Sequence, residues 1–261
     1  MSERFTSEEI MTVAAARMLS NGAVCFVGIG LPSTAANLAR LTHAPDAILI
    51  YESGPIGAKP PVLPLSIGDG NLAETADTVV STPEIFRYWL QGGRIDVGFL
   101  GAAQLDRFAN INTTVVGPYN RPKARLPGAG GAPEISSSVK EVLIIVKQSK
   151  RTFVEKLDFI TSVGFLTGGD AREAAGLSGN GPTAVITDLC VMRPDPLTRE
   201  LKVSNIHPGV NRETIKASTG WTVGFAETCE HTPPPTAHEL ETLRDLKTRT
   251  ALAHGIQGDA E

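Results

Sequence analysis

The chain has 261 residues, of which 41% are hydrophobic and 20% are charged, as in ordinary soluble globular proteins. A net charge of -4 with interspersed signs argues against nucleic acid as a partner. No apolar run approaches the roughly 20 residues that a membrane helix needs. The N-terminal segment MSERFTSEEI lacks the basic-then-apolar order of a signal peptide, so we expect a cytoplasmic protein.

The length fits one large α/β domain, and we interpret residues 1–261 as a single domain with its core at about 6–250. The C-terminal segment GIQGDAE is expected to be a frayed tail.

The cysteines and histidines give no sign of a metal centre. The cysteines, Cys25, Cys190 and Cys229, are odd in number and widely separated, so we expect free thiols. No pair of histidines has the H-x-x-x-H spacing of metal ligands, and no G-x-S-x-G motif is present for a serine nucleophile. The sequence therefore predicts neither a metal site nor a serine triad.

The first elements are an opening helix and two buried strands. Thr6 and Glu9 have capping-box spacing, and Asn21 and Gly22 end the helix. The continuous apolar run AVCFVG predicts a strand covered on both faces, and the turn GIGLPS then opens a helix that extends to Leu41. The run AILIYE is again apolar, so Glu52 falls at the carboxyl end of a buried strand.

The rest of the chain continues the alternation of helices and strands. The expected elements are a helix from Ser81 to Gly92–Gly93, a strand at 95–102, a turn between short strands at 104–114, a strand at 141–147, an antiparallel hairpin of 184–192 with 201–206, and helices at 210–217 and 237–250 joined by the stiff run 233–235. This order predicts an open, mostly parallel sheet with helices on both faces. Such sheets bind ligands at the carboxyl ends of their strands.

Glu52 is the first candidate for chemistry. It follows five largely apolar residues and precedes Ser-Gly-Pro, without an obvious structural partner. One interpretation is a buried glutamate held by backbone amides or a salt bridge, and the other is a functional carboxylate. From its position alone, both interpretations remain open.

Two glycine clusters, GIGLP at 28–32 and PGAGGA at 127–132, adjoin apolar strands. Glycines let backbone N–H groups approach a ligand closely, although each cluster also fits an ordinary tight turn. Neither is a nucleotide fingerprint, because Ser33 occupies the place of the third glycine and no Gly-Lys-Ser/Thr is present.

Other candidates are a basic strand and an aromatic pair. Arg121, Lys123 and Arg125 alternate along one strand face, which is either solvated or holds a carboxylate or phosphate. Tyr88 and Trp89 fit a core or an interface better than a stacking platform.

In combination, these segments resemble the B subunits of class I CoA-transferases over nearly the whole chain. The residues that carry the resemblance are VGIGLP at 27–32, ESG at 52–54, LGAAQLDRFANIN at 100–112, RPKARLPGAGGA at 121–132 and HPGV at 207–210. The resemblance implies that Glu52 is the glutamate that carries CoA as a glutamyl thioester.

The resemblance also implies roles for other residues and for a partner. Backbone N–H groups would line the CoA site and form an oxyanion hole at the glycines Gly28, Gly30, Gly128, Gly130 and Gly131. Lys123 and Arg125 would hold a substrate carboxylate or a CoA phosphate. The CoA thioester would be a substrate rather than a resident cofactor. A homologous A subunit would complete a heterodimer that assembles into a heterotetramer or larger complex.

Two phrases, MTVAAARMLSNGAVCFVGIGLPS and YESGPIGAKPPVLPLSIGDG, resemble most closely the family members that act on 3-oxoadipate, and next those that act on glutaconate. The first resemblance implies CoA transfer from succinyl-CoA to 3-oxoadipate in the β-ketoadipate pathway of aromatic-compound degradation. The alternatives are a glutaconate or other dicarboxylate or 3-oxoacid CoA-transferase, a CoA-thioester hydrolase or decarboxylase on the same scaffold, and a non-catalytic ligand-sensing module.

Overall fold

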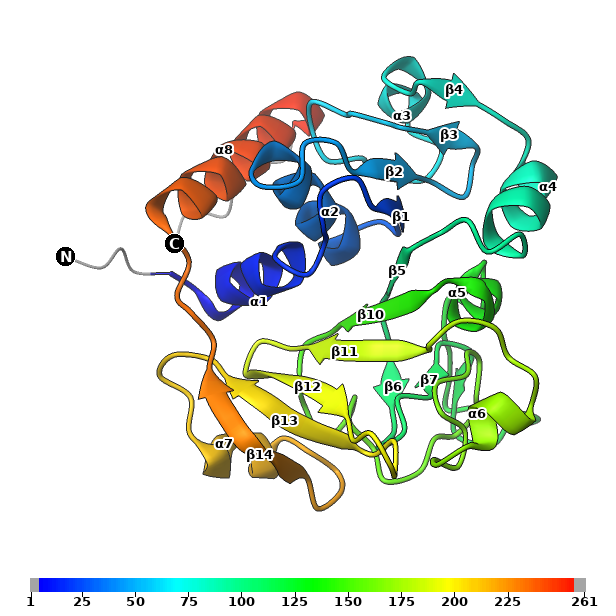
Figure 1. The fold of residues 1–261 in the computed structure, drawn as a ribbon, viewed down its shortest axis with the longest axis vertical. Coiled ribbons are helices and arrows are strands. Elements are labelled where there is room, and N and C mark those ends of the chain that lie inside the picture. The colour runs from blue at the N-terminus through cyan, green and yellow to red at the C-terminus, as the bar shows by residue number, and fades with distance from the viewer. Residues whose placement is uncertain (1–4, 256–261) are drawn as a thin grey trace. The chain divides into compact units, whose positions relative to one another are not determined.

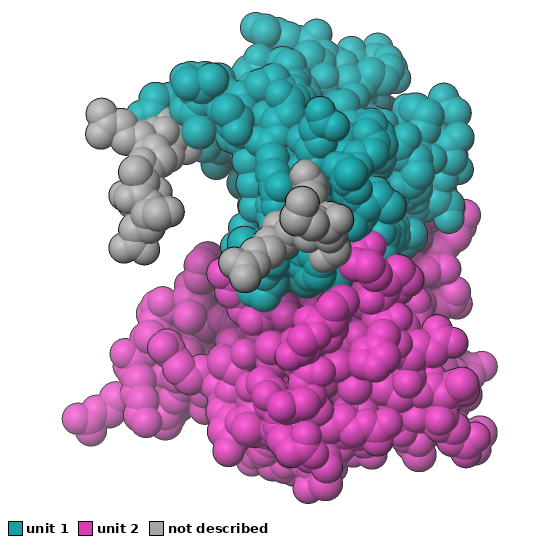
Figure 2. Space-filling view, turned by 90° about the vertical axis from the view of Figure 1, so that its left-hand side faces the viewer, with its two compact units in different colours: residues 1–85, 235–261 teal, residues 86–234 magenta. Residues whose placement is uncertain are grey.

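The computed structural model describes residues 5–255. The chain divides into two compact units, which Figure 2 shows in different colours. The first unit comprises residues 1–85 and 235–261, and the second comprises residues 86–234. The tail that we expected to be frayed lies, apart from Gly255, outside the described residues.

The first unit begins with the predicted capped helix, α1 (Ser7–Ala16). The Thr6 hydroxyl accepts a hydrogen bond from the Glu9 backbone N–H at 3.1 Å. In return, the Glu9 carboxylate accepts one from the Thr6 N–H at 2.8 Å. This reciprocal pair satisfies two N–H groups that a helix start leaves without partners, so the capping box predicted from the sequence is confirmed.

Two strands and a helix follow, and they position the candidate site. They are β1 (Val24–Phe26), α2 (Leu31–Leu41) and β2 (Ile48–Ile50). β1 and β2 run parallel, with Val24 opposite Ile48 and Phe26 opposite Ile50. The side chains of Phe26, Leu38 and Leu49 are buried in the core of this unit. The continuous apolar runs are therefore explained by strands covered by helices.

The first unit continues with short elements that the sequence did not predict: β3 (Pro55–Ile56), α3 (Gly70–Glu74) and β4 (Thr78–Val79). β3 pairs antiparallel with both β2 and β4, giving the order β1-β2-β3-β4 within this unit. Two-residue strands carry too few side chains to show a period of two, so the pattern did not reveal them. The last helix, α8 (Ala237–His254), returns to pack on α1 and α2 (Figure 1).

The predicted helix after Ser81 is present as α4 (Thr82–Glu84), followed by a π-helical turn at Ile85–Leu90. The second unit is then built on a six-stranded arrangement in the order β5-β10-β11-β12-β13-β14. β5, β10 and β11 are parallel to one another, and β13 and β14 are also parallel. The strands are β5 (Val97–Leu100), β10 (Glu141–Ile145), β11 (Pro182–Ile186), β12 (Cys190–Pro194), β13 (Leu201–Ile206) and β14 (Gly224–His231).

The predicted hairpin of 184–192 with 201–206 needs correction. The segment AVITDLCVM is two strands rather than one, because the Thr187 hydroxyl accepts hydrogen bonds from the N–H groups of Leu189 and Cys190 and turns the chain. β12 is the antiparallel partner of β13, and β11 pairs antiparallel with β12.

The predicted helices near the end are confirmed as α7 (Arg212–Ala217) and α8, but β14 lies between them and was not predicted. The sequence of β14, GFAETCEH, has mixed polarity, and none of its residues is buried. It therefore lacks the apolar run or strict alternation that signals a strand.

The remaining elements of the second unit are short. β6 and β7 pair antiparallel around the predicted turn, and β8 and β9 form a second small hairpin. The elements are β6 (Gln104–Leu105), β7 (Ile111–Asn112), β8 (Val115–Val116), β9 (Ala124–Arg125), α5 (Ala132–Ser138) and α6 (Ala171–Ala174). Among residues 5–255, no helix has the length and apolar character needed to cross a membrane.

Candidate active site

Glu52 lies in a tight turn at the end of β2. The Gly54 N–H donates to the Tyr51 carbonyl at 3.0 Å, and the Tyr51 N–H donates to the Pro55 carbonyl at 3.1 Å. Gly54 has φ = +119°, and a Cβ atom at this position would lie 2.1 Å from the carbonyl oxygen of Val80. Only glycine fits both the backbone conformation and the space. The E-S-G order therefore fixes the turn that holds Glu52.

The Glu52 carboxylate has no hydrogen bond or ion pair with any residue in the described range 5–255, and the residue is half-buried. The neighbouring Ser53 Oγ is buried and also lacks a partner in that range. The structural interpretation requires a backbone amide or a cation that holds the carboxylate, and residues 5–255 provide neither.

The first glycine turn emerges at the same sheet edge as Glu52. The Val27 N–H donates to the Ile50 carbonyl at 2.9 Å, which continues the parallel ladder up to the two turns. Gly30, with φ = +81°, is the N-cap of α2 and has no atom within 4 Å of a Cβ position. The backbone N–H groups of residues 28–30 meet no acceptor in the part of the chain that the structure describes. They are free to bind a ligand oxygen.

A buried polar network, which the sequence did not reveal, connects these two turns. Tyr51 is fully buried, and its hydroxyl lies 3.2 Å from Ser33 Oγ and 3.4 Å from Asn37 Nδ2. Burial raises the pKa of Tyr51, so its hydroxyl stays neutral. The network ties α2 to the residue before Glu52. Its signal in the sequence is the pair Ser33 and Asn37, two polar residues four apart on a buried helix face.

The second glycine turn belongs to the second unit. The Gly128 N–H donates to the Thr113 carbonyl, and the Thr113 hydroxyl donates to the Gly128 carbonyl, both at 2.8 Å. Gly128 and Gly130 have φ values of +102° and +49° with open space around them, and Gly131 is the N-cap of α5. Among the described residues, no acceptor is found for the N–H groups of Gly130 and Gly131.

The basic side chains Lys123 and Arg125 are exposed and lie just before that turn. Arg125 donates to the Tyr119 carbonyl at 3.2 Å, and its guanidinium carbon lies 5.0 Å from the centre of the Tyr119 ring.

The structure brings Glu52 together with Gly28 and Gly30 in the first unit. In the second unit it brings Lys123 and Arg125 together with Gly128, Gly130 and Gly131.

Tyr88 is exposed and Trp89 half-buried, so Tyr88 is not a core residue.

The three cysteines are free thiols, as predicted. No group of three or more His, Cys, Asp or Glu side chains suited to a metal ion is found within residues 5–255.

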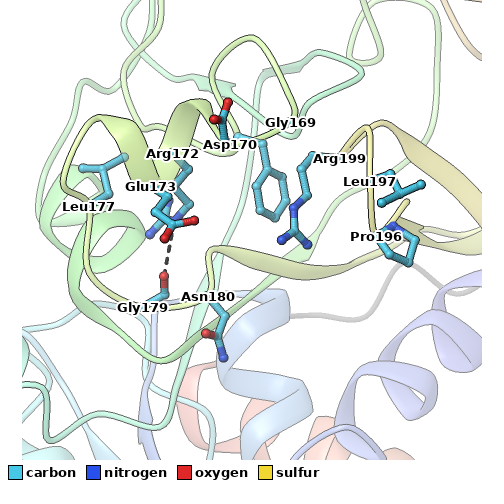
Figure 3. A pocket seen from close by; sticks show the side chains of 11 residues that line it. Gly169, Asp170, Arg172, Glu173, Leu177, Gly179, Asn180, Pro196, Leu197 and Arg199 are labelled. Atoms are coloured by element: carbon cyan, nitrogen blue, oxygen red, sulfur yellow. Dashed lines mark hydrogen bonds between the residues drawn. The ribbon is translucent and has the colours of Figure 1, made fainter.

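A cavity of about 540 Å³ in the second unit contains none of the predicted site residues (Figure 3). One of its lining residues, Arg172, donates to the carbonyl groups of Gly164 at 3.0 Å and of Ser136 and Ser178 at 2.8 Å. Burial lowers the pKa of Arg172. Because its donors are engaged by the backbone, Arg172 braces the loops around it and is not available to a ligand.

The chain is an α/β protein. Its first unit presents an unpaired glutamate beside a glycine turn at the carboxyl end of parallel strands. The chain belongs to the coenzyme A transferase family, whose model matches residues 8–218. The resemblance found in the motifs is therefore confirmed.

The relatives agree with this assignment. The B subunit of the 3-oxoadipate CoA-transferase of Pseudomonas knackmussii is 70% identical over 257 residues, covering 98% of this chain and 99% of the relative. The B subunit of the glutaconate CoA-transferase of Acidaminococcus fermentans is 32% identical over 239 residues, 89% of each chain. The crystal structure of glutaconate CoA-transferase from the same organism has a TM-score of 0.87 at 30% identity and covers 93% of this chain and 94% of that one.

A solved decarboxylase, AibA/AibB, has a TM-score of 0.80 at 25% identity and covers 94% of this chain and 96% of its own. The match to the glutaconate CoA-transferase structure confirms the predicted α/β fold with a mixed, mostly parallel sheet.

Proposed function

We propose that the chain is the B subunit of a heteromeric CoA-transferase that moves CoA from succinyl-CoA to 3-oxoadipate in the β-ketoadipate pathway. The observation that carries the proposal is the unpaired carboxylate of Glu52 in a turn that Gly54 fixes. The choice of substrates is supported by the 70% identity to the B subunit of a 3-oxoadipate CoA-transferase over nearly the whole chain.

In the first half-reaction, a carboxylate oxygen of Glu52 attacks the thioester carbonyl of succinyl-CoA. Glutamate side chains are ionised at neutral pH, so this attack needs no general base. The C–S bond breaks and gives CoA thiolate and a mixed anhydride of Glu52 and succinate. The thiolate then attacks the Glu52 carbonyl of the anhydride, succinate leaves, and Glu52 becomes a CoA thioester.

The second half-reaction runs the same steps in reverse. The carboxylate of 3-oxoadipate attacks the Glu52 thioester and expels the thiolate, which gives an anhydride of Glu52 with the new acid. The thiolate attacks the 3-oxoadipyl carbonyl of that anhydride. The free Glu52 carboxylate leaves, and 3-oxoadipyl-CoA is formed without a net change in protons or electrons.

Backbone donors are proposed to stabilise the oxyanions that precede each anhydride. The free N–H groups of residues 28–30, at the sheet edge of Glu52, are the first candidates. One such donor in a water-excluded site contributes about 3 kcal/mol to transition-state stabilisation. For Gly128, Gly130 and Gly131 we propose the same kind of donor role toward the CoA thioester, which is a substrate and not a resident cofactor.

Substitution of Glu52 tests the central role. In the enzyme assembled with its A subunit, Glu52→Ala is expected to abolish transfer. Glu52→Asp should be nearly as damaging because the carboxylate retreats by one methylene. Transfer is measured as 3-oxoadipyl-CoA formed from succinyl-CoA. The matched control is Glu74→Ala, because Glu74 is an exposed glutamate of the same unit. Near wild-type turnover by Glu52→Ala would refute the role.

Mass spectrometry of the intermediate is an independent test. When the enzyme is mixed with succinyl-CoA and no acceptor, CoA should be found attached to the peptide that contains Glu52. Release of free succinate and CoA in the absence of acceptor would indicate a hydrolase instead. Faster turnover with glutaconate than with 3-oxoadipate would reassign the acceptor but leave the mechanism unchanged.

A further inference from the structure

A fully buried tyrosine directly precedes Glu52 in the first unit. The side chain of Tyr51 is 0% exposed, so its hydroxyl does not contact a substrate. The hydroxyl lies 3.2 Å from Ser33 Oγ and 3.4 Å from Asn37 Nδ2, both on α2. A phenylalanine would fill the same space without a polar group that needs a partner in the core. The hydroxyl and its two partners therefore call for a reason other than packing.

The backbone of Tyr51 holds the turn that carries Glu52. Its carbonyl accepts a hydrogen bond from the Gly54 N–H at 3.0 Å, and its N–H donates to the Pro55 carbonyl at 3.1 Å. Both bonds close the turn around Glu52, so a displacement of Tyr51 moves Glu52 with it. Because the Glu52 carboxylate has no hydrogen bond or ion pair of its own within residues 5–255, its position depends on this turn.

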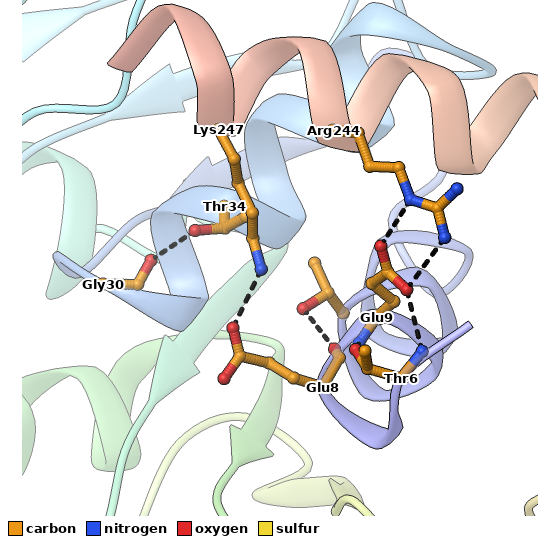
Figure 4. A network of polar contacts seen from close by, with 8 residues as sticks. Thr6, Glu8, Glu9, Gly30, Thr34, Arg244 and Lys247 are labelled. Carbon is orange, nitrogen blue, oxygen red and sulfur yellow. Dashed lines mark hydrogen bonds and ion pairs between the residues drawn. The ribbon is translucent and has the colours of Figure 1, made fainter. Parts of the chain in front are cut away.

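The partners of the Tyr51 hydroxyl lie near the start of α2, next to the first glycine turn. Ser33 and Asn37 are buried, and Asn37 Nδ2 also donates to the Ser33 carbonyl at 2.9 Å. The neighbouring Thr34 donates to the Gly30 carbonyl from its N–H at 3.0 Å and from its hydroxyl at 3.1 Å (Figure 4). The start of α2 thus fixes Gly30, and Tyr51 is anchored to the same stretch of helix.

From these contacts we infer that Tyr51 is a positioning residue for the transfer reaction. Its hydroxyl, held by α2, sets the distance between the Glu52 carboxylate and the free N–H groups of residues 28–30. The inference rests on the proposed function, in which the carboxylate attacks a carbonyl whose oxygen those N–H groups stabilise. Attack and stabilisation act on one C=O group, so they demand a fixed distance between the two turns. All of these residues belong to the first unit.

Tyr51→Phe tests the inference in the assembled two-subunit enzyme, because it removes the hydroxyl and keeps the ring. The rate constant for forming the Glu52–CoA thioester is measured in single turnovers at saturating succinyl-CoA. This rate constant is expected to fall about tenfold, a part of the roughly hundredfold cost of a 1 Å misplacement. The succinyl-CoA concentration that gives half the maximal rate should not change, since the buried network does not contact the substrate.

Thr42→Val is the matched control on the same helix. The Thr42 hydroxyl donates to the Leu38 carbonyl at 2.7 Å at the far end of α2. Its loss should lower stability in urea and leave the single-turnover rate at the wild-type value. If Tyr51→Phe also reacts at the wild-type rate, or loses rate only as Thr42→Val does, the Tyr51 hydroxyl has a purely structural role and the inference is wrong.

A double-mutant cycle gives a second readout. Ser33→Ala removes a partner of the Tyr51 hydroxyl and should lower the same rate constant by about tenfold. The double variant with Tyr51→Phe should be no slower than the slower single variant, because both changes remove one anchor. Losses that multiply to about a hundredfold would contradict the inference. Ser33→Ala alone carries the test if Tyr51→Phe does not fold.

The wild-type enzyme separates this inference from the proposed function. If the wild type forms the Glu52–CoA thioester and Tyr51→Phe forms it equally fast, the function stands and the inference is refuted. If the wild type never forms the thioester, the proposed function fails and the inference fails with it.

Discussion

At the scale of single residues, Glu52 depends on the glycine two positions after it. The turn needs a positive φ at Gly54, and the Val80 carbonyl occupies the space where a side chain would begin. The sequence identified both residues through the E-S-G motif. It could not identify Val80, which directly follows β4 and lies more than twenty residues later in the chain, because such a contact leaves no local pattern.

Gly54→Ala is therefore expected to destabilise the protein by at least about 2 kcal/mol and to lower transfer activity more than tenfold, since it combines backbone strain with a clash. Denaturant unfolding and the transfer assay measure the two effects. Gly22→Ala is the matched control in the same unit. Gly22 also has a positive φ, of +76°, but no atom lies within 4 Å of its Cβ position, so strain alone should cost about 1 kcal/mol. Equal losses in the two variants would contradict the role of Val80.

At the scale of elements, α1 and α8 are joined by ion pairs although they lie at opposite ends of the chain (Figure 4). Arg244 of α8 donates to the two carboxylate oxygens of Glu9 at 2.7 and 3.3 Å. Lys247 donates to Glu8 at 2.8 Å. The sequence predicted Glu9 as a capping residue of α1. Its second partner, 235 residues away, became evident only from the fold.

The pH dependence of stability follows from this contact. The Arg244 hydrogen bond, opposed by burial, holds the pKa of Glu9 below its ordinary value of 4.5. Because the pKa is lower in the folded state, the stabilisation is complete above pH 4.5 and is lost as the pH falls through the folded-state pKa. Glu9→Gln keeps the capping box and should destabilise the protein by about 1 kcal/mol at pH 7.

This difference in stability should shrink as the pH falls below 4.5, as measured by urea unfolding between pH 7 and pH 3. The control is Glu241→Gln, at an exposed position of α8, which should unfold like the wild type throughout. A Glu9→Gln deficit that stays constant down to pH 3 would show that the ion pair is not its cause.

At the scale of the whole molecule, two relatives are the B subunits of a 3-oxoadipate and a glutaconate CoA-transferase, which indicates that this chain works with an A subunit. We expect the isolated chain to have no transfer activity and mixing with the A subunit to restore it, because the A subunit would contribute to substrate binding and exclude water from the anhydride. Turnover titrated against added A subunit should rise to a plateau at equal amounts of the two chains. Full activity of the chain alone would contradict this expectation.

Local patterns in the sequence specified the buried parallel strands, the capped helices and the glutamate at a strand end, because these depend on apolar runs and on turn residues a few positions apart. The sequence also identified the family, because several motifs occur together. The two-residue strands were missed because they are too short to show a period of two, and the break at Thr187 because its side-chain hydrogen bonds lie within a continuous apolar run. The Tyr51 network and the contact of Gly54 with Val80 depend instead on atoms brought together from separate segments of the chain. They became evident only from the fold, because burial and hydrogen bonding act on distance in space rather than on spacing in sequence.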